Sequence, residues 1–248
     1  MTKELKYAVV IPARYKSSRF PGKPLVDLCG KTMIQHVWER CCLAVPSRLV
    51  YIATDSDKIR NAASKFGAKV IMTSEHCLTG TDRLGEANAF LNCDFIVNVQ
   101  GDEPLIEPEV IRRVVATYMD NQQLVVNAMC KIADESEFRS LSIPKVVASK
   151  SNTLLYMSRS PIPGNKLDTF DFGYKQVCVY AFSSEHLKFF CTQRVKTPLE
   201  ESEDIEILRF VENDIQVKMV EVDASSIAVD FPSDVDKVIR HMKSLSNS

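Results

Sequence analysis

Short β-branched runs alternate with segments of helical periodicity through the first half of this chain, and this alternation limits the possible folds. The runs that read as buried strands lie at residues 7–11, 49–53, 69–72 and 95–99. The segments that repeat apolar side chains at helical spacing lie at residues 33–41, 59–66, 82–91 and 107–118. Four successive βα units predict an α/β fold with a mostly parallel twisted sheet and helices on both faces, in a Rossmann-like three-layer arrangement.

The pattern loosens after residue 120, where strands and helices no longer alternate. We expect strands at residues 124–130, 145–148 and 176–182, helices at 198–211 and 233–242, and a loop at 161–165. Because no repeat or low-complexity linker interrupts the chain, we expect one domain over residues 1–248. Residues 125–225 would then form a smaller mixed lobe over the sheet.

Charge, hydropathy and cysteine spacing exclude several classes of protein. The chain has 31 basic and 32 acidic residues, so it has no electrostatic footprint for nucleic acid or an anionic membrane. No apolar stretch approaches the 18 residues of a membrane span and the start is polar, which favours a cytoplasmic protein. Its eight cysteines contain no C-x-x-C pair, so we expect free thiols rather than a zinc ribbon or a redox motif.

A basic loop, residues 12–23, follows the first expected strand. Ligands of such sheets bind at the carboxyl ends of the strands. Arg14, Arg19 and Lys23 could hold a triphosphate there, together with backbone N–H groups and the start of the next helix. A solvated charged loop is the alternative. The loop matches neither the P-loop nor the dinucleotide-binding motif.

A second polar segment, Gln100 to Pro104, follows the fourth expected strand. Asp102 lies just past the end of an apolar run, and a hard cation such as Mg²⁺ prefers oxygen ligands of this kind. The alternative is that Asp102 and Glu103 only begin the next helix.

Both segments resemble one enzyme family. Residues 11–25 are similar to the I-P-A-R-x-x-S-[ST]-R-[LF]-P-G-K-P-L loop of the 3-deoxy-manno-octulosonate cytidylyltransferases, and match every fixed position. Residues 98–104 resemble a second motif of that family, N-[VL]-Q-G-D-E-P. The resemblance implies a nucleotidyltransferase that uses CTP, with the backbone of Pro12 and Ala13 beside the nucleotide. It also implies that Arg14, Arg19 and Lys23 bind the phosphates.

The resemblance also implies a magnesium site and a reaction. Residues 228–232 resemble the family segment G-V-D-T-P, although two of the five residues differ, and Asp102 and Asp230 are the implied metal ligands. The anomeric hydroxyl of an eight-carbon acidic sugar, 3-deoxy-manno-octulosonate (Kdo), would attack the α-phosphorus of CTP and expel pyrophosphate. Positioning and charge neutralisation would carry this step without a dedicated base. The implied catalytic residues are Arg14, Arg19, Lys23, Asp102 and Asp230.

Further motifs imply where the base and the sugar bind. Residues 72–83 resemble the family stretch M-T-x-x-x-H-x-S-G-T-[DE]-R, with Thr79 in place of serine and His76 one position early. Taken alone, Gly80 to Asp82 reads as a helix cap. The implied nucleotide contacts beyond the phosphate loop are Thr79, Gly80, Arg83 and Gln100. Residues 158–163 match S-R-[SA]-x-I-P, which implies that Arg159 meets the sugar carboxylate rather than being a surface arginine.

The sugar-pocket motifs depart from the family at two positions. Gln176 stands where the family has histidine, and Ile207 stands where it has glutamine. These changes favour Kdo or an analogue altered at its far end, such as 8-amino-3,8-dideoxy-octulosonate. We expect most acids of residues 200–206 to form a solvated face, with Glu206 turned to the sugar. The implied sugar contacts are Gln100, Arg159, Gln176, Tyr180, Glu206 and Ile207.

Two other functions remain open from the sequence. A sialic-acid-type CMP-sugar synthetase shares the chemistry, although both motifs fit the Kdo group better. A non-catalytic nucleotide-binding module could share the fold. For the enzyme, the resemblance implies a homodimer, with a role in lipopolysaccharide or capsule synthesis.

Overall fold

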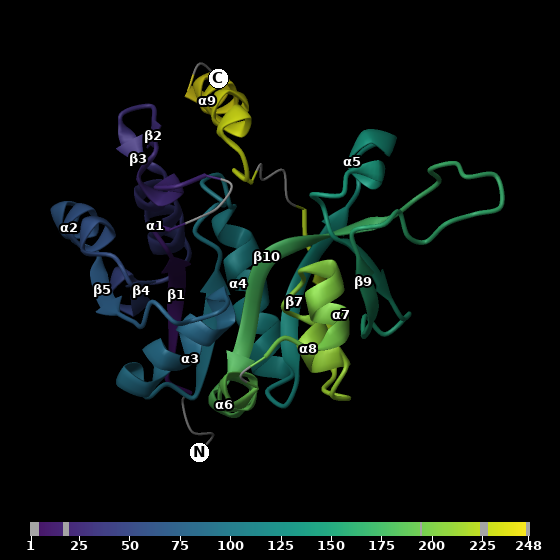
Figure 1. Ribbon diagram of the computed structural model, residues 1–248, viewed down its shortest axis with the longest axis horizontal. Helices are drawn as coiled ribbons and strands as arrows, with labels where there is room; N and C mark the ends of the chain where they lie inside the picture. The colour runs from purple at the N-terminus through teal and green to yellow at the C-terminus, as the bar shows by residue number, and fades with distance from the viewer. Residues whose placement is uncertain (1–4, 17–19, 194, 224–227, 247–248) are drawn as a thin grey trace.

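The fold is organised around one large sheet, in a computed structural model that describes residues 5–16, 20–193, 195–223 and 228–246 (Figure 1). Seven strands follow the order β11-β7-β10-β6-β1-β4-β5. Their bounds are β1 (Tyr7–Ala13), β4 (Val50–Thr54), β5 (Lys69–Met72), β6 (Phe95–Val99), β7 (Val125–Lys131), β10 (Tyr174–Ser183) and β11 (Val217–Glu221).

The pairing of these strands is mostly parallel. β1 pairs in parallel with β4 on one side and with β6 on the other, β4 pairs in parallel with β5, and β11 pairs in parallel with β7. Only β10 on this path runs against its neighbours, β6 and β7. The mostly parallel sheet that the alternation predicts is therefore confirmed, with one antiparallel strand inserted near its middle.

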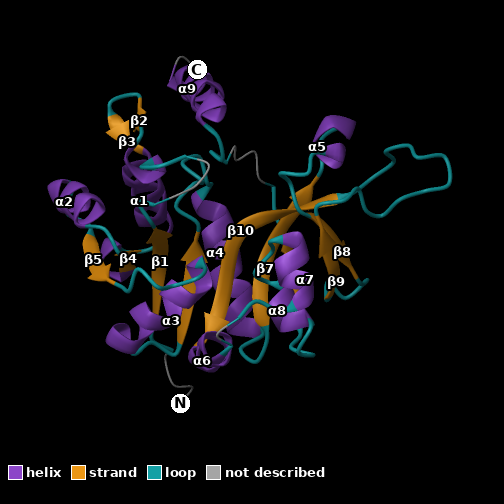
Figure 2. Cartoon of the chain, in the orientation of Figure 1, coloured by secondary structure: helices purple, strands orange, loops and turns teal. Residues whose placement is uncertain are grey.

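Helices cover both faces of the sheet, which makes three layers (Figure 2). Alternate residues of β1 point to opposite faces: Val9 lies in one apolar cluster and Val10 in the other. α1 (Met33–Ala44), α2 (Asp57–Lys65) and α4 (Pro108–Asp120) contribute to the first cluster. The second takes side chains from α3 (Gly80–Leu91), α6 (Ser184–Thr192) and α8 (Leu208–Val211).

A smaller lobe extends the sheet beyond β10. The antiparallel hairpin of β8 (Lys145–Ala148) and β9 (Leu154–Ser158) joins the start of β10, and α5 (Glu135–Arg139) lies beside it. The expected single helix over residues 198–211 is wrong. Two short helices, α7 (Pro198–Glu203) and α8, are separated at Asp204, whose φ of 51° is left-handed and ends α7.

The C-terminal helix returns to the first half of the chain. α9 (Pro232–Ser246) and the residues before it pack in a third apolar cluster, in which Val229 and Val238 contact Leu28 and Met33. Leu28 belongs to the small sheet of β2 (Asp27–Leu28) and β3 (Lys31–Thr32), while η1 (Lys23–Leu25) and η2 (Ser47–Leu49) are single turns. None of the helices described is long and apolar enough to cross a membrane.

Candidate active site

A cleft of about 890 Å³ lies where β1 and β6 end, between the sheet and the smaller lobe. Most of the residues that the sequence motifs single out line it. These are Pro12, Ala13, Arg14, Lys23, Thr79, Gly80, Arg83, Gln100, Asp102, Arg159, Gln176, Tyr180, Glu206 and Asp230. Two do not: Arg19 falls outside the described residues, and Ile207 is buried in the core, where an apolar side chain replaces the family's glutamine.

Two aspartates that are distant in sequence meet at Lys23. The Lys23 ammonium lies 2.9 Å from an Asp102 carboxylate oxygen and 3.9 Å from one of Asp230, and it donates to the Val229 carbonyl at 2.8 Å. The Val229 N–H in turn donates to the Asp102 carbonyl at 3.0 Å, which ties the segment before α9 to the end of β6. The side chains of Lys23, Asp102 and Asp230 are 17%, 28% and 29% exposed. This triad is therefore accessible to a ligand in the cleft.

The donor set of this triad fits a magnesium ion bound together with a polyphosphate. Mg²⁺ uses one or two carboxylates and takes its remaining ligands from phosphate oxygens and water. Asp102 and Asp230 supply two carboxylates, and the Lys23 ammonium shows that a cation is accepted beside them. In the part of the chain that the structure describes, no group of three His, Cys, Asp or Glu side chains is placed to hold a metal ion. An all-protein cage is thus not available there.

Gly101 allows the end of β6 to approach the end of β1 closely. A Cβ added to Gly101 would lie 2.9 Å from the Pro12 carbonyl oxygen, which is backbone and cannot rotate away. We expect Gly101→Ala to push these two segments apart and to cost about 1 to 3 kcal/mol of stability. It should also lower kcat/KM about tenfold or more, because Asp102 follows directly. Urea unfolding and steady-state kinetics measure the two effects, and wild-type values for both would contradict the expectation.

Arg14 reaches the cleft from the loop after β1. Its side chain is exposed, and within the described residues it has no ion-pair partner. The nearby Lys16, by contrast, pairs with Glu75 at 3.0 Å on the surface. Arg14 and Lys23 therefore place two cations along the edge of the cleft, at the carboxyl ends of the strands.

The N-terminus of α3 forms another wall of the cleft; its cap is Thr79, one residue before the expected cap of Gly80 to Asp82. The Thr79 hydroxyl accepts from the Asp82 N–H at 3.2 Å, and the Asp82 carboxylate accepts from the Thr79 N–H at 3.0 Å. Two further N–H groups, of Gly80 and Thr81, donate to the Glu206 carboxylate at 3.2 and 2.9 Å. Burial raises the pKa of Glu206, while these hydrogen bonds oppose the rise. The anion at this helix end is therefore the protein's own Glu206.

Arg83 and Gln176 line the cleft but have partners in the protein. The buried Arg83 guanidinium pairs with Asp55 at 3.1 Å and donates to the Thr73 hydroxyl. The Gln176 side-chain amide donates to the side-chain oxygen Oδ1 of Asn127 at 3.0 Å. These contacts hold both side chains in fixed positions in the cleft wall.

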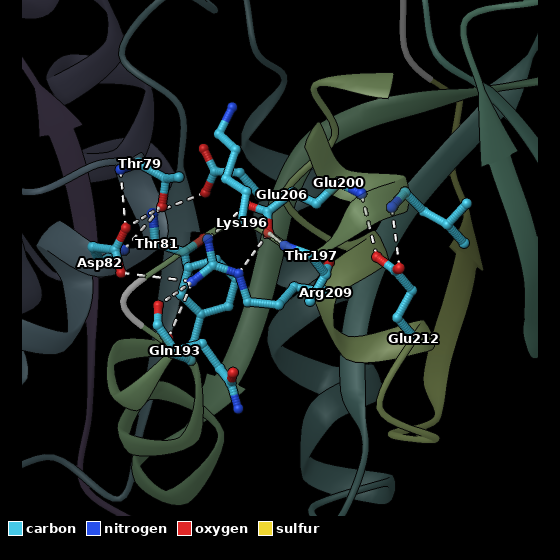
Figure 3. A network of polar contacts seen from close by, with 12 residues as sticks. Thr79, Thr81, Asp82, Gln193, Lys196, Thr197, Glu200, Glu206, Arg209 and Glu212 are labelled. Atoms are coloured by element: carbon cyan, nitrogen blue, oxygen red, sulfur yellow. Dashed lines mark hydrogen bonds and ion pairs between the residues drawn. The ribbon is translucent and has the colours of Figure 1, made fainter. Parts of the chain in front are cut away.

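The sequence motifs do not indicate several of the residues around the cleft. Arg209 and Glu200 form a buried pair that backs the α3 N-terminus (Figure 3). Lys145 is a fully buried lysine behind the lobe wall. A charge at the head of the apolar run K-V-V-A is the one signal that could have indicated Lys145. Nothing in residues 200–206 distinguishes the buried Glu200 from the exposed Glu201 beside it.

Comparisons with known proteins identify the family of the chain. The family model described as Cytidylyltransferase matches residues 8–219. A 3-deoxy-manno-octulosonate cytidylyltransferase of Geobacter metallireducens is 41% identical, over 96% of this chain and 98% of its own length. The mitochondrial 3-deoxy-manno-octulosonate cytidylyltransferase of Arabidopsis thaliana is also 41% identical, over 92% of this chain and 80% of its own.

Solved structures give the same result for the fold. The CMP:2-keto-3-deoxy-manno-octonic acid synthetase complexed with CTP superposes with a TM-score of 0.89 at 37% identity, and the match covers 96% of this chain and 99% of that one. A putative glucose-1-phosphate thymidylyltransferase from Bacillus anthracis has a TM-score of 0.65 at 13% identity, covering 95% and 94%. That second likeness concerns the fold alone.

Proposed function

Because the chain belongs to the family of 3-deoxy-manno-octulosonate cytidylyltransferases, we propose that it transfers CMP from CTP to the anomeric hydroxyl of Kdo and releases pyrophosphate. The observation that carries the proposal is the meeting of Asp102 and Asp230 at Lys23 in the cleft. Arg14 lines the same cleft. A site for a nucleoside triphosphate needs cations for the phosphates and carboxylates for the metal that accompanies them.

The residues of the chain have distinct roles in this proposal. Lys23 uses two of its three N–H groups on Asp102 and on the Val229 carbonyl, which leaves one for a phosphate oxygen. Arg14, and Arg19 by resemblance, would neutralise the remaining charge of the triphosphate. Asp102 and Asp230 would hold Mg²⁺. When bound, the ion supplies positive charge at the phosphates and lowers the pKa of the attacking hydroxyl.

The sugar side of the cleft is where this chain departs from its family. Of the two departures, Ile207 is in the core, so only Gln176 changes the wall of the cleft itself. We propose that the sugar is Kdo or an analogue altered at its far end, such as the 8-amino form. Comparing kcat/KM for the two sugars at saturating CTP tests this choice, and a clear preference for unmodified Kdo would rule out the amino analogue.

The reaction itself is tested by pyrophosphate release from CTP, with and without Kdo. We expect release only when both substrates and Mg²⁺ are present, a complete loss of activity with EDTA, and recovery when Mg²⁺ is added in excess. Mass spectrometry should then find CMP-Kdo. Turnover of a sialic acid but not of Kdo, or no CTP-dependent product at all, would reject the proposal. We also propose that the protein is a cytoplasmic homodimer. Light scattering would measure the mass of the dimer.

A further inference from the structure

Four consecutive carbonyls in the lobe wall of the cleft point at two cations. Lys145 donates to the carbonyls of Ser140 and Ile143, both at 2.7 Å. The Arg159 guanidinium donates to those of Leu141 and Ser142, at 3.0 and 3.4 Å. We call residues 140–143 the wall segment; Ser140, Ser142 and Ile143 line the cleft. The shape of this wall therefore depends on two positive charges.

Lys145 also holds Arg159 itself, because its third N–H donates to the Arg159 carbonyl. The rest of the Arg159 guanidinium is directed at the end of α7: Nε donates to the Glu203 carbonyl at 2.5 Å and Nη2 to the Asp204 carbonyl at 3.0 Å. The Arg159 N–H donates to the Glu203 carboxylate at 2.8 Å. Lys145 thus joins the wall segment, the end of β9 and the end of α7.

Most donors of Arg159 are committed to backbone in this arrangement. Its guanidinium has five N–H groups on three nitrogens, and all three nitrogens donate to the carbonyls of residues 141, 142, 203 and 204. The orientation of the Arg159 guanidinium toward a ligand is therefore set by the backbone around it. Lys145 fixes part of that backbone.

Burying the charged side chain of Lys145 at this position costs free energy. Its side chain is 0% exposed, and within the described residues it forms no ion pair. A buried ammonium without a carboxylate partner is costly unless hydrogen bonds replace its lost hydration. Three carbonyls accept from all three of its N–H groups. An uncharged residue of similar length would leave these three carbonyls without a donor.

We propose that Lys145 is a positioning residue for the sugar half of the cleft: its ammonium fixes the wall segment and the backbone of Arg159 in the form that binds the acidic sugar. This inference rests on the proposed function. It predicts that the loss of the Lys145 charge weakens sugar binding and leaves CTP binding unchanged. The hydrogen bonds of Lys145 go to residues 140, 143 and 159, and none of them reaches Lys23, Asp102 or Asp230.

The test is the substitution Lys145→Met with both substrates titrated separately. We expect the KM for Kdo to rise about tenfold or more and the KM for CTP to stay within about twofold. Lys218→Met is a matched control: Lys218 lies in β11, donates to the Ser151 carbonyl at 2.6 Å, and does not line the cleft. It should leave both KM values unchanged. An unchanged KM for Kdo in Lys145→Met, or equal rises in both KM values, would overturn the inference.

The wild-type enzyme gives a second test if Lys145→Met does not fold. Burial, and then the charge of Arg159, lower the pKa of Lys145 to about 8, while Glu203 acts in the opposite direction. Lys175 faces it across the strands and is paired with Glu137. Once neutral, the amine has two N–H groups for three carbonyls. The KM for Kdo should therefore rise between about pH 7 and about pH 9.5, and a flat KM would overturn the inference.

The pH dependence of stability distinguishes weaker sugar binding at high pH from loss of the fold. The pKa of Lys145 is lower in the folded protein than in the unfolded chain, so between the two values the unfolded chain binds more protons. The contribution of Lys145 to the free energy of unfolding therefore rises with pH, while sugar binding weakens. No turnover of either Kdo or its 8-amino analogue by the wild-type enzyme near neutral pH rejects the proposed function and this inference together. Normal turnover with an unchanged KM in every arm rejects the inference alone.

Discussion

Replacing Asp102 with asparagine is expected to lower kcat about a hundredfold to a thousandfold while leaving the fold intact. The substitution keeps the shape of the side chain but removes the negative charge that lies 2.9 Å from the Lys23 ammonium. One of the two carboxylates available to the metal would be lost with it. Because the Asp102 side chain is partly exposed, the cost in stability should stay near about 1 kcal/mol. Pyrophosphate release measures the first effect and thermal unfolding the second.

Three companion variants sharpen this experiment. Asp57→Asn is the control, since Asp57 pairs with Arg60 at 3.1 Å on the exposed side of α2 and does not line the cleft. It should keep wild-type kcat. Asp230→Asn should resemble Asp102→Asn, and the double variant should lose little more than either single one, because groups that hold one ion act as a unit. A kcat above about a tenth of wild type in Asp102→Asn would remove Asp102 from the proposed site.

The sheet could be predicted from the sequence because its central strands are buried on both faces. In β1 every residue from Ala8 to Ala13 is buried, so the run has no polar alternation and indicates a strand covered on both sides. The place of β10 could not be predicted in the same way. Its antiparallel insertion between β6 and β7 joins residues from distant parts of the chain, and no local pattern records which strands become neighbours.

The cleft could be located from the sequence because the fold brings strand ends together. Segments after β1 and after β6 meet for a geometric reason, and the motif around Asp230 adds a third segment that 128 residues separate from Asp102. The geometry inside the cleft could not be predicted from the sequence. Glu206 could be assigned to the site, but its two hydrogen bonds to the start of α3 depend on how α7 and α8 break at Asp204.

The acidic run of residues 200–206 shows most clearly where pattern alone fails. Its composition indicates a solvated helical face, yet Glu200 is fully buried and only Glu201 of the pair is exposed. The partner of Glu200 is Arg209, nine residues later, which is not a spacing at which side chains meet on one helix. The left-handed Asp204 makes the meeting possible by turning the chain back, and an aspartate tolerates that conformation without the glycine that would have marked it.

The buried Glu200–Arg209 pair should dominate the stability of this lobe. Both side chains are 0% exposed, and they meet in two bonds: Nε to Oε2 at 2.6 Å and Nη2 to Oε1 at 2.7 Å. Arg209 also donates to the Phe190 and Gln193 carbonyls, and its guanidinium lies 3.6 Å from the centre of the Phe190 ring. Glu200→Leu would leave this buried guanidinium with only the Asp82 carboxylate, 3.9 Å away, and we expect a loss of about 3 kcal/mol in the free energy of unfolding by urea.

A double variant distinguishes the pair from simple packing. Glu200→Leu combined with Arg209→Met removes both charges, so it should recover most of the loss, because the cost arises from the unpaired charge rather than from the missing bond. The same two substitutions at the exposed pair of Glu109 and Arg112, 2.7 Å apart in α4, should each change stability by less than about 1 kcal/mol. If the double variant is as unstable as Glu200→Leu alone, Arg209 stabilises the lobe through its contacts with the α6 carbonyls and Phe190, not through its pairing with Glu200.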